Sequence, residues 1–367
     1  MKTKRPWLVA CSFAVVLTLS GQVTLKDKPT KSEWRFNPEK IWEVETAGGE
    51  SFGRIAELLV SDKENIYVRD FERNISYLFD NNGRFIKKFA PQGNGDGQLS
   101  HYLNRFQAGD KIVLAAPDKL HYFFQDGTFD HAVENNLFMR FPLLFMSENE
   151  FVYAPNLPRS PVHDKKLVTV DLSSGKEKVL VDFSEKEGQD QNAAPGAMVM
   201  IFSLTPQVRL AYDGKTMVFG RSDQYTIYLA DQAGKIFSSF GLDRKKLTAS
   251  PEDKRNQVAD SSIPKEMIDK IIAQLPDEMT YFSHMTSLQG LIYVFAVADM
   301  APKTASQAID IFSEKGEYLY RGTIDFGGQL KFGSPSNLIL KDNYLYVIHE
   351  NEEGKQTLAK YRIQLPR

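Results

Sequence analysis

RIAELLVSDKENIYVRDFERNISYLFDNNGRFIKKF, residues 54–89, is the stretch that decides the fold of this 367-residue chain. It holds four apolar segments, RIAELLVS (54–61), NIYVRD (65–70), NISYLFD (74–80) and RFIKKF (84–89), separated by short polar turns. Each segment is short and rich in β-branched and aromatic side chains, which favours strands. Because short turns join antiparallel neighbours, the stretch predicts a four-stranded antiparallel sheet.

The same unit recurs along the chain. Further copies begin at LNRFQAG (103–109), FPLLFMS (141–147), QVRLAYDG (207–214), YFSHMTS (281–287) and SNLILKD (336–342). A glycine stands in the last turn of the first five units, where a tight hairpin requires a positive φ: Gly83, Gly127, Gly175, Gly234 and Gly316. Repeats of roughly 45 residues with four strands each are typical of β-propeller blades. No helix-length apolar pattern separates the strands, which excludes a parallel α/β fold.

The sixth unit contains only three strands, the last being QTLAKYRIQL (356–365). A strand with alternating apolar residues, KIWEVET (40–46), precedes the first unit and belongs to none. A strand that joins the two ends of the repeat closes the ring and removes open sheet edges. We therefore predict an all-β fold over residues 40–365: a six-bladed β-propeller of four-stranded antiparallel blades, closed by this N-terminal strand.

Two motifs carry a resemblance to a known family. GNGDGQL (93–99) is similar to the segment between blades in NHL-repeat propellers, and IYVRD (66–70) followed by Asn74 resembles the family's strand pattern. The chain departs from the family at Tyr102, where a proline is usual, and in the wider spacing between the last residue of IYVRD and Asn74. The resemblance covers residues 39–365 and implies an exported bacterial propeller. It implies no single activity, because this fold carries scaffolds, lyases and lactonases alike.

The N-terminal residues 1–21 have the features of a secretory signal peptide. A basic run at residues 2–5 precedes an apolar segment, 7–19, that is short for a membrane span. We expect cleavage after residue 21, export to the periplasm or the extracellular space, and a linker over residues 22–39. Two alternatives stay open: an uncleaved anchor, or a membrane-anchored lipoprotein, because the four residues that end at Cys11 resemble a lipobox.

The charge balance narrows the choice of partners. The chain has 45 Lys and Arg against 47 Asp and Glu, and its net charge is -2. This balance gives no basis for binding nucleic acid or an anionic membrane surface. We therefore expect a membrane contact only through an uncleaved signal or a lipidated Cys11.

Long connections gather on one face of the predicted ring, which we call the long-loop face. It carries the connections between the second and third strands of each blade and those between blades, while the opposite face has only tight turns such as Asp62–Glu64. The long connections are Pro91–His101, Pro155–Lys165, Ser184–Pro206, Leu242–Thr280, Asp299–Ser306 and Phe326–Pro335. Long loops of a compact fold often carry function, so we expect a protein or a small anionic ligand to bind there.

The longest connection, at about residues 243–280 between blades 4 and 5, predicts a small helical insertion. Ser250 and Pro251 form a helix start, and Pro264 opens a second helix that Pro276 ends. The apolar stripe of this second helix comprises Met267, Ile268, Ile271, Ile272 and Leu275. Two interpretations remain: a structural cap across blades 4 and 5, or a lid or docking element.

Polar side chains recur at one position of the first strands, which line the central channel of a propeller. By alignment of these strands they are Glu57, Arg105, Arg209 and His284, with Asn337 beside the corresponding position of the last blade. Arginine matches planar oxyanions, so this column is a candidate site for a carboxylate or a phosphate at the channel mouth. The alternative is that these groups satisfy one another as bridges between blades.

A second polar set stands where the second strands end: Asp70, Asn156, Asp223, Asp299 and Glu350. Hard oxygen ligands that converge from several blades suit calcium, so the set is an alternative metal site. Asp70 is also explained as an acceptor that caps its loop. His101, His163 and His349 lie on the same face as single histidines, and no zinc, P-loop, dinucleotide or serine-elbow motif is present.

Two functions from different classes remain. The first is an exported, non-catalytic binding or scaffold propeller that uses the long-loop face and needs no cofactor. The second is a metal-dependent propeller hydrolase or lyase, similar to a lactonase, with calcium in its channel. Arg105 and Arg209 in the channel column would repel a cation, which favours the binding protein.

Overall fold

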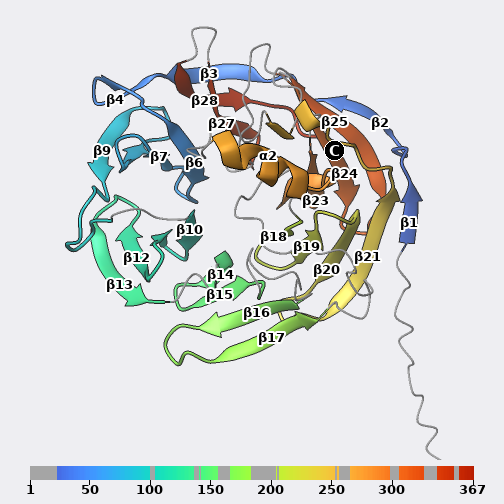
Figure 1. The fold of residues 1–367 in the computed structure, drawn as a ribbon, viewed down its shortest axis with the longest axis horizontal. Coiled ribbons are helices and arrows are strands. Elements are labelled where there is room, and N and C mark those ends of the chain that lie inside the picture. Colours follow the sequence, from blue (N-terminus) through green and yellow to red (C-terminus); the bar gives the residue numbers. More distant parts are fainter. Residues whose placement is uncertain are drawn as a thin grey trace, which may run out of the picture.

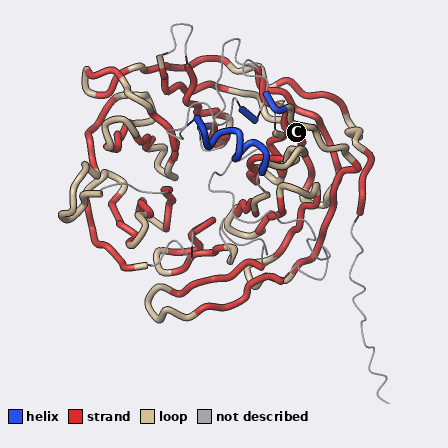
Figure 2. The backbone as a smooth tube through the Cα atoms, in the orientation of Figure 1, coloured by secondary structure: helices blue, strands red, loops and turns tan. Residues whose placement is uncertain are grey.

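A computed structural model of the chain describes residues 23–99, 104–135, 140, 142–155, 166–182, 204, 206–252, 254–255, 265–297, 306–325, 337–350 and 355–367. Its strands form six sheets of four or five strands, set around a central axis as the blades of a propeller (Figure 1). Within the described residues the regular structure is almost entirely β, and the longest helix has 10 residues (Figure 2). The predicted all-β class and the six-bladed propeller are confirmed.

The first three blades follow the repeat closely. Their strands are β6 (Ile55–Val60), β7 (Ile66–Asp70), β8 (Ile75–Phe79) and β9 (Phe85–Phe89); β10 (Asn104–Ala108), β11 (Lys111–Ala115), β12 (Lys119–Phe124) and β13 (Phe129–Glu134); and β14 (Pro142–Ser147), β15 (Glu150–Tyr153), β16 (Lys166–Asp171) and β17 (Glu177–Asp182). Each of these sheets is hydrogen-bonded in sequence order, and all of their strand pairs are antiparallel.

The last three blades contain the same four-strand unit, completed at the ring closure by an N-terminal strand. Their strands are β18 (Val208–Tyr212), β19 (Met217–Arg221), β20 (Thr226–Ala230) and β21 (Ile236–Asp243); β22 (Phe282–Leu288), β23 (Leu291–Ala296), β24 (Ser306–Ser313) and β25 (Tyr318–Asp325); and β26 (Leu338–Lys341), β27 (Tyr344–Glu350) and β28 (Gln356–Arg362). Blade 6 takes its outer strand from β3 (Glu39–Val44), which pairs antiparallel with β28. The predicted closure by this strand is confirmed.

The outer edges of blades 4 and 5 each carry a fifth strand, where the sequence predicted a linker over residues 22–39. β1 (Val23–Lys26) pairs parallel with β21, and β2 (Ser32–Arg35) pairs parallel with β25. Figure 1 shows β1, β2 and β3 following one another along the outside of blades 4, 5 and 6. The reason for the difference is that an outer strand leaves backbone groups unpaired, and a neighbouring extended segment can satisfy them. We call residues 23–44 the N-terminal strap.

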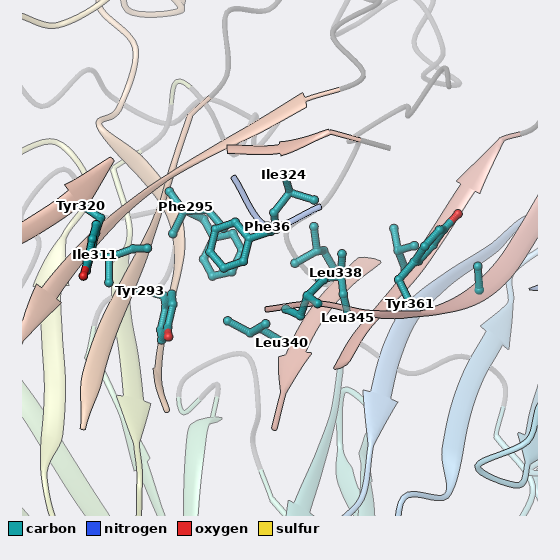
Figure 3. Close-up of a cluster of buried hydrophobic side chains, with 14 residues drawn as sticks. Phe36, Tyr293, Phe295, Ile311, Tyr320, Ile324, Leu338, Leu340, Leu345 and Tyr361 are labelled. Carbon is teal, nitrogen blue, oxygen red and sulfur yellow. The ribbon is translucent and has the colours of Figure 1, made fainter. Parts of the chain in front are cut away.

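The hydrophobic core consists of six separate layers, one at each seam between neighbouring blades. Figure 3 shows the layer between blades 5 and 6, where Phe36 of the strap lies among side chains of both blades and is fully buried. Gly322 of β25 leaves room for this ring, since a Cβ there would lie 2.7 Å from Phe36 Cε2. The strap is therefore part of the core as well as of the sheets.

A β4–β5 hairpin, Thr46–Ala47 and Glu50–Ser51, joins the strap to the first blade. The turn between β8 and β9 also contacts the strap: a Cβ on Gly83, whose φ is +76°, would lie 2.8 Å from the indole ring of Trp42. The indole Nε1 of Trp42 donates to Asn81 O of the same turn, at 3.0 Å. These contacts fix the closing strand against blade 1.

The insertion between blades 4 and 5 contains α2 (Lys265–Gln274), as the apolar stripe predicts. Ile271 and Leu275 are buried with Ala249, Met279 and Leu204. Val297, at the end of β23, packs against the same cluster, and buried Lys254 Nζ donates to Leu275 O at 3.0 Å. The insertion therefore packs through its own apolar cluster and against the end of β23.

The predicted signal peptide, including Cys11, lies outside the described residues, which begin at Val23. Among the residues that the structure describes, no helix is long and apolar enough to cross a membrane.

Candidate binding site in the central channel

The innermost strands of the six blades are β6, β10, β14, β18, β22 and β26, which surround the ring axis (Figure 1). Glu57, Arg105, Arg209 and His284 lie on four of them, and Asn337 directly precedes β26. The structure therefore places the predicted column around one channel. It divides the five residues into two groups.

The first group, Glu57, Arg105 and Asn337, joins blades 6, 1 and 2. Arg105 Nη1 donates to Glu57 Oε2 at 3.0 Å, and the guanidinium side chain is only 3% exposed. The backbone N–H of Glu57 donates to Asn337 Oδ1 at 3.0 Å. These hydrogen bonds cross the seam between blades 1 and 2 and the seam between blades 6 and 1. Glu57, Arg105 and Asn337 therefore act as structural bridges between blades.

Glu57 occupies a strained position. Its φ is +58°, and the pairing of β6 with β7 shifts register between Ala56 and Leu59. A non-glycine residue in the left-handed region costs free energy, and such sites are often functional or held by strong local contacts. Burial raises the pKa of Glu57, although the charges of Arg105 and Arg69 lower it in part. The bulge is what brings this carboxylate to Arg105.

The second group, Arg209 and His284, lies at the seam between blades 4 and 5. Burial lowers the pKa of Arg209 to about 10. Burial, and then the nearby charge of Arg209, lower the pKa of His284 to about 4. Both side chains are partly exposed, and burial has the larger effect on each pKa. His284 is therefore neutral at pH 7 beside a charged guanidinium.

The inner strands carry an excess of positive charge. Their carboxylate is Glu57 and their guanidinium groups are those of Arg105 and Arg209, while Lys341 at the tight-turn end pairs with Asp62 at 3.3 Å. Glu57 pairs with Arg105, while the inner strands of blades 4 and 5 contribute Arg209 and neutral His284 at their seam.

The alternative calcium set contains residues whose oxygens already accept hydrogen bonds. Asp70 is fully buried and accepts from the backbone N–H groups of Gly53, Glu72 and Arg73 at 2.9, 3.1 and 3.1 Å, and from the Arg73 guanidinium at 2.8 Å. Asp223 pairs with Arg221 at 2.7 Å. Asn156 and Asp299 lie outside the described residues. Among the described residues, no three His, Cys, Asp or Glu side chains are grouped to hold a metal ion.

The single histidines differ in their surroundings. His101 and His163 lie outside the described residues. His349 Nε2 lies 3.0 Å from Thr357 Oγ1 and 3.3 Å from Glu43 Oε1 of the closing strand. Burial lowers the pKa of His349, although Glu43 raises it in part. This histidine therefore joins blade 6 to the strap, and Glu350 is the last residue of β27 beside it.

Sequence reasoning missed a charged network at the outer seam of blades 4 and 5. Arg244, after β21, donates to Asp27 of the strap at 2.6 and 3.0 Å and to Asp310 of β24 at 2.6 and 2.9 Å. Tyr225 and Tyr318 hydroxyls also donate to Asp310, at 2.5 and 2.6 Å. The one signal in the sequence was an aspartate inside the apolar strand AIDIF, at Asp310.

The long-loop face is described only in part. The connection after blade 1 is described up to Leu99, and most of the insertion after blade 4 is described. The connections 156–165, 183–203, 298–305 and 326–336 lie outside the described residues. Binding at this face by those loops stays a prediction.

Neither a protein-family model nor a curated protein matches the sequence. Solved structures resemble it in fold. A member of the DUF4221 family from Bacteroides vulgatus has 11% identity and a TM-score of 0.57, with 89% of this chain and 98% of that chain covered. A Bacteroides fragilis protein described as exported has 14% identity and a TM-score of 0.52, with 91% and 99% covered. At such identities the likeness shows the fold alone.

Virginiamycin B lyase from Staphylococcus aureus is also similar, at 10% identity over 83% of this chain and 79% of that chain. Its TM-score of 0.40 reflects a superposition too loose to bear on function. Fold-level likeness leaves the chemistry to the residues of the site itself.

Proposed function

We propose that this protein is an exported binding propeller, without catalysis of its own, whose channel takes up an anionic group beside Arg209 and His284. The observation that carries the proposal is the placement of Arg209 and a neutral histidine together on the inner strands of blades 4 and 5. Burial and the nearby charge of Arg209 keep His284 neutral, so a guanidinium and an imidazole N–H can both face an anion there.

The chemistry of the pair suits a carboxylate or a phosphate. The Arg209 guanidinium offers parallel N–H donors, and neutral His284 has one ring N–H to donate. In a poorly screened channel an anion interacts with a guanidinium several times more strongly than in bulk water. A bound anion would also offset the effects that lower the pKa of His284, so ligand binding and histidine protonation are linked.

The anion is either a free small molecule or an acidic side chain of a partner protein that enters from the long-loop face. Both present the same group to the channel. Export places the protein outside the cytoplasm, and mass spectrometry of the native N terminus tests this: a start near Gln22 supports it, while a lipidated Cys11 supports the lipoprotein alternative.

Thermal unfolding in a panel of acetate, succinate, citrate and inorganic phosphate tests the binding site, with Arg209→Gln as the variant. We expect at least one anion to raise the melting temperature of the wild type, and we expect Arg209→Gln to abolish this response. Arg105→Gln is the matched control: it breaks the pair with Glu57 and lowers stability, but it keeps the anion response.

NMR titration of the His284 ring protons measures the pKa of this histidine and is a second, independent test of anion binding. The pKa of His284, about 4 without ligand, should rise when the active anion is added. Absence of any anion effect on melting and on the His284 titration would contradict the proposal. Stabilisation by calcium, with anions inactive, would instead support the metal-dependent hydrolase or lyase.

A further inference from the structure

A pocket of about 370 Å³ lies at the outer seam of blades 4 and 5, away from the channel column. Its walls come from three segments: the connection between β19 and β20 with the start of β20, the end of β21 with the residues that follow it, and strand β1 of the strap. Tyr281, just before β22, forms the remaining wall. The volume is within the range of small-molecule sites, about 300–1,000 Å³.

The charged network at this seam holds the pocket walls in place. Arg244, which lines the pocket, is bonded to Asp27 and Asp310, and its guanidinium lies 5.1 Å from the ring centre of Tyr225. The rings of Tyr225 and Tyr281 meet edge to face at 5.5 Å, and Tyr281 OH donates to Arg244 O at 3.0 Å. The walls therefore have fixed positions, which is the condition for a preformed site.

Three polar side chains in the lining have unused hydrogen-bonding capacity. Within the described part of the chain, the side chains of Thr24, Gln224 and Asp243 make no hydrogen bond and no ion pair. Together they offer a hydroxyl, a carboxamide and a carboxylate from three different segments. A ligand with several hydroxyl groups can donate to and accept from all three.

Most charged side chains around the pocket are matched in ion pairs. Asp223 is paired with Arg221 at 2.7 Å, and Lys246 with Glu278 at 3.1 Å. Arg244 is paired with Asp27 and Asp310, and the carboxylate of Asp243 repels an anion. A neutral, polar molecule avoids this repulsion, and the ring of Tyr281 supplies an apolar surface for its carbon face.

We propose that this pocket binds a neutral saccharide, a mono- or disaccharide unit, and that the N-terminal strap completes the site. Asp243 and Gln224 bind ligand hydroxyls from blade 4, and Thr24 binds from β1. Because Thr24 belongs to the strap, ligand binding and strap docking stabilise each other. The site is separate from the channel and does not rest on the function proposed above.

The test is a binding panel of glucose, galactose, N-acetylglucosamine and maltose, measured on the full-length mature protein by saturation-transfer NMR and calorimetry. We expect one or more of these sugars to bind, and Asp243→Ala and Gln224→Ala each to weaken that binding at least tenfold. Asp269→Ala, an exposed acid on α2 that is 79% exposed and outside the pocket, is the matched control and should bind normally.

Hydrogen exchange of residues 23–27 supplies a readout of the coupling to the strap. The bound sugar should slow exchange there, and this protection should be lost in Asp243→Ala. Binding of none of the sugars, preference for the charged analogues glucuronate or glucosamine, or equal binding by wild type and both pocket variants would each overturn the proposal. Arg209→Gln should leave sugar binding unchanged, so failure of this site and failure of the channel site are distinguishable.

Discussion

Replacement of Asp310 by asparagine removes the central charge of the network between blades 4 and 5. The carboxylate is 2% exposed and accepts four hydrogen bonds: two from Arg244, at 2.6 and 2.9 Å, one from Tyr225 at 2.5 Å and one from Tyr318 at 2.6 Å. The substitution keeps the size of the side chain. It leaves the guanidinium with Asp27 as its remaining carboxylate partner.

The cost follows from the burial of the pair. Loss of one partner of a buried ion pair costs about 3–5 kcal/mol. Because Asp27, which Arg321 also contacts, still pairs with Arg244, we expect the lower end, about 3 kcal/mol, for Asp310→Asn. Asp310→Ala also strands two tyrosine hydroxyls at about 1 kcal/mol each, which gives about 5 kcal/mol. At about 2 °C per kcal/mol for a large domain, the melting temperature falls by about 6 and 10 °C.

Urea and thermal unfolding, followed by far-UV circular dichroism, measure these differences. Asp269→Asn is the control, since its pair with Arg255 is 79% and 58% exposed and should contribute less than about 0.5 kcal/mol. If Asp310→Asn stays within about 1 kcal/mol of the wild type, or costs no more than the control, the network does not stabilise the seam and the reasoning is refuted.

Three further predictions follow from the strap, the first blade and the channel. Deletion of every residue before Ala47 should lower the melting temperature by more than 10 °C relative to deletion of residues 1–22, because three blades lose an outer strand; equal values would show that ring closure is dispensable. Asp70→Ala should cost about 2–3 kcal/mol in urea unfolding, as buried N–H donors lose their acceptor, and a loss of calcium stabilisation in this variant would instead identify a metal ligand. His284 has a folded pKa of about 4, below its unfolded value of about 6.5, so the folded state binds fewer protons and stability is lost as pH falls between these values. His284→Gln should therefore flatten the decline between pH 6.5 and 4, by up to about 3 kcal/mol, and an unchanged slope would argue against the buried neutral histidine.

Local patterns made most of the ring predictable. In the first blade the strands begin and end within a residue or two of the predicted segments, because alternation and the turn at Gly83 act over short distances. The sequence predicts a linker where β1 and β2 form. VTLK and SEWR have only four residues each, and each pairs with a single strand at the outer edge of a blade. Their partners lie far along the chain, and parallel edge pairing leaves no period in the sequence.

The sequence predicted which residues lie along the channel, but it did not predict which of them form ion pairs. Alignment of the first strands identified Arg105 and Glu57 as neighbours in one column, but the positive φ of Glu57 and its bulge, which set the contact, have no sequence signal. The network of Asp27, Arg244 and Asp310 combines three distant segments. Its one signal in the sequence is Asp310, a charged residue inside an otherwise apolar strand.

The strap also sets the order in which the ring can be assembled. Asp27 contacts Arg244 across 217 residues, and Trp34 of β2 donates to Gln364 across 330 residues. The first strands to leave the ribosome thus pair with strands of blades 4, 5 and 6, which are made later. Loop closure over such distances slows folding. Blades 1 to 3 can therefore pack before the N-terminal strap pairs with blades 4 to 6.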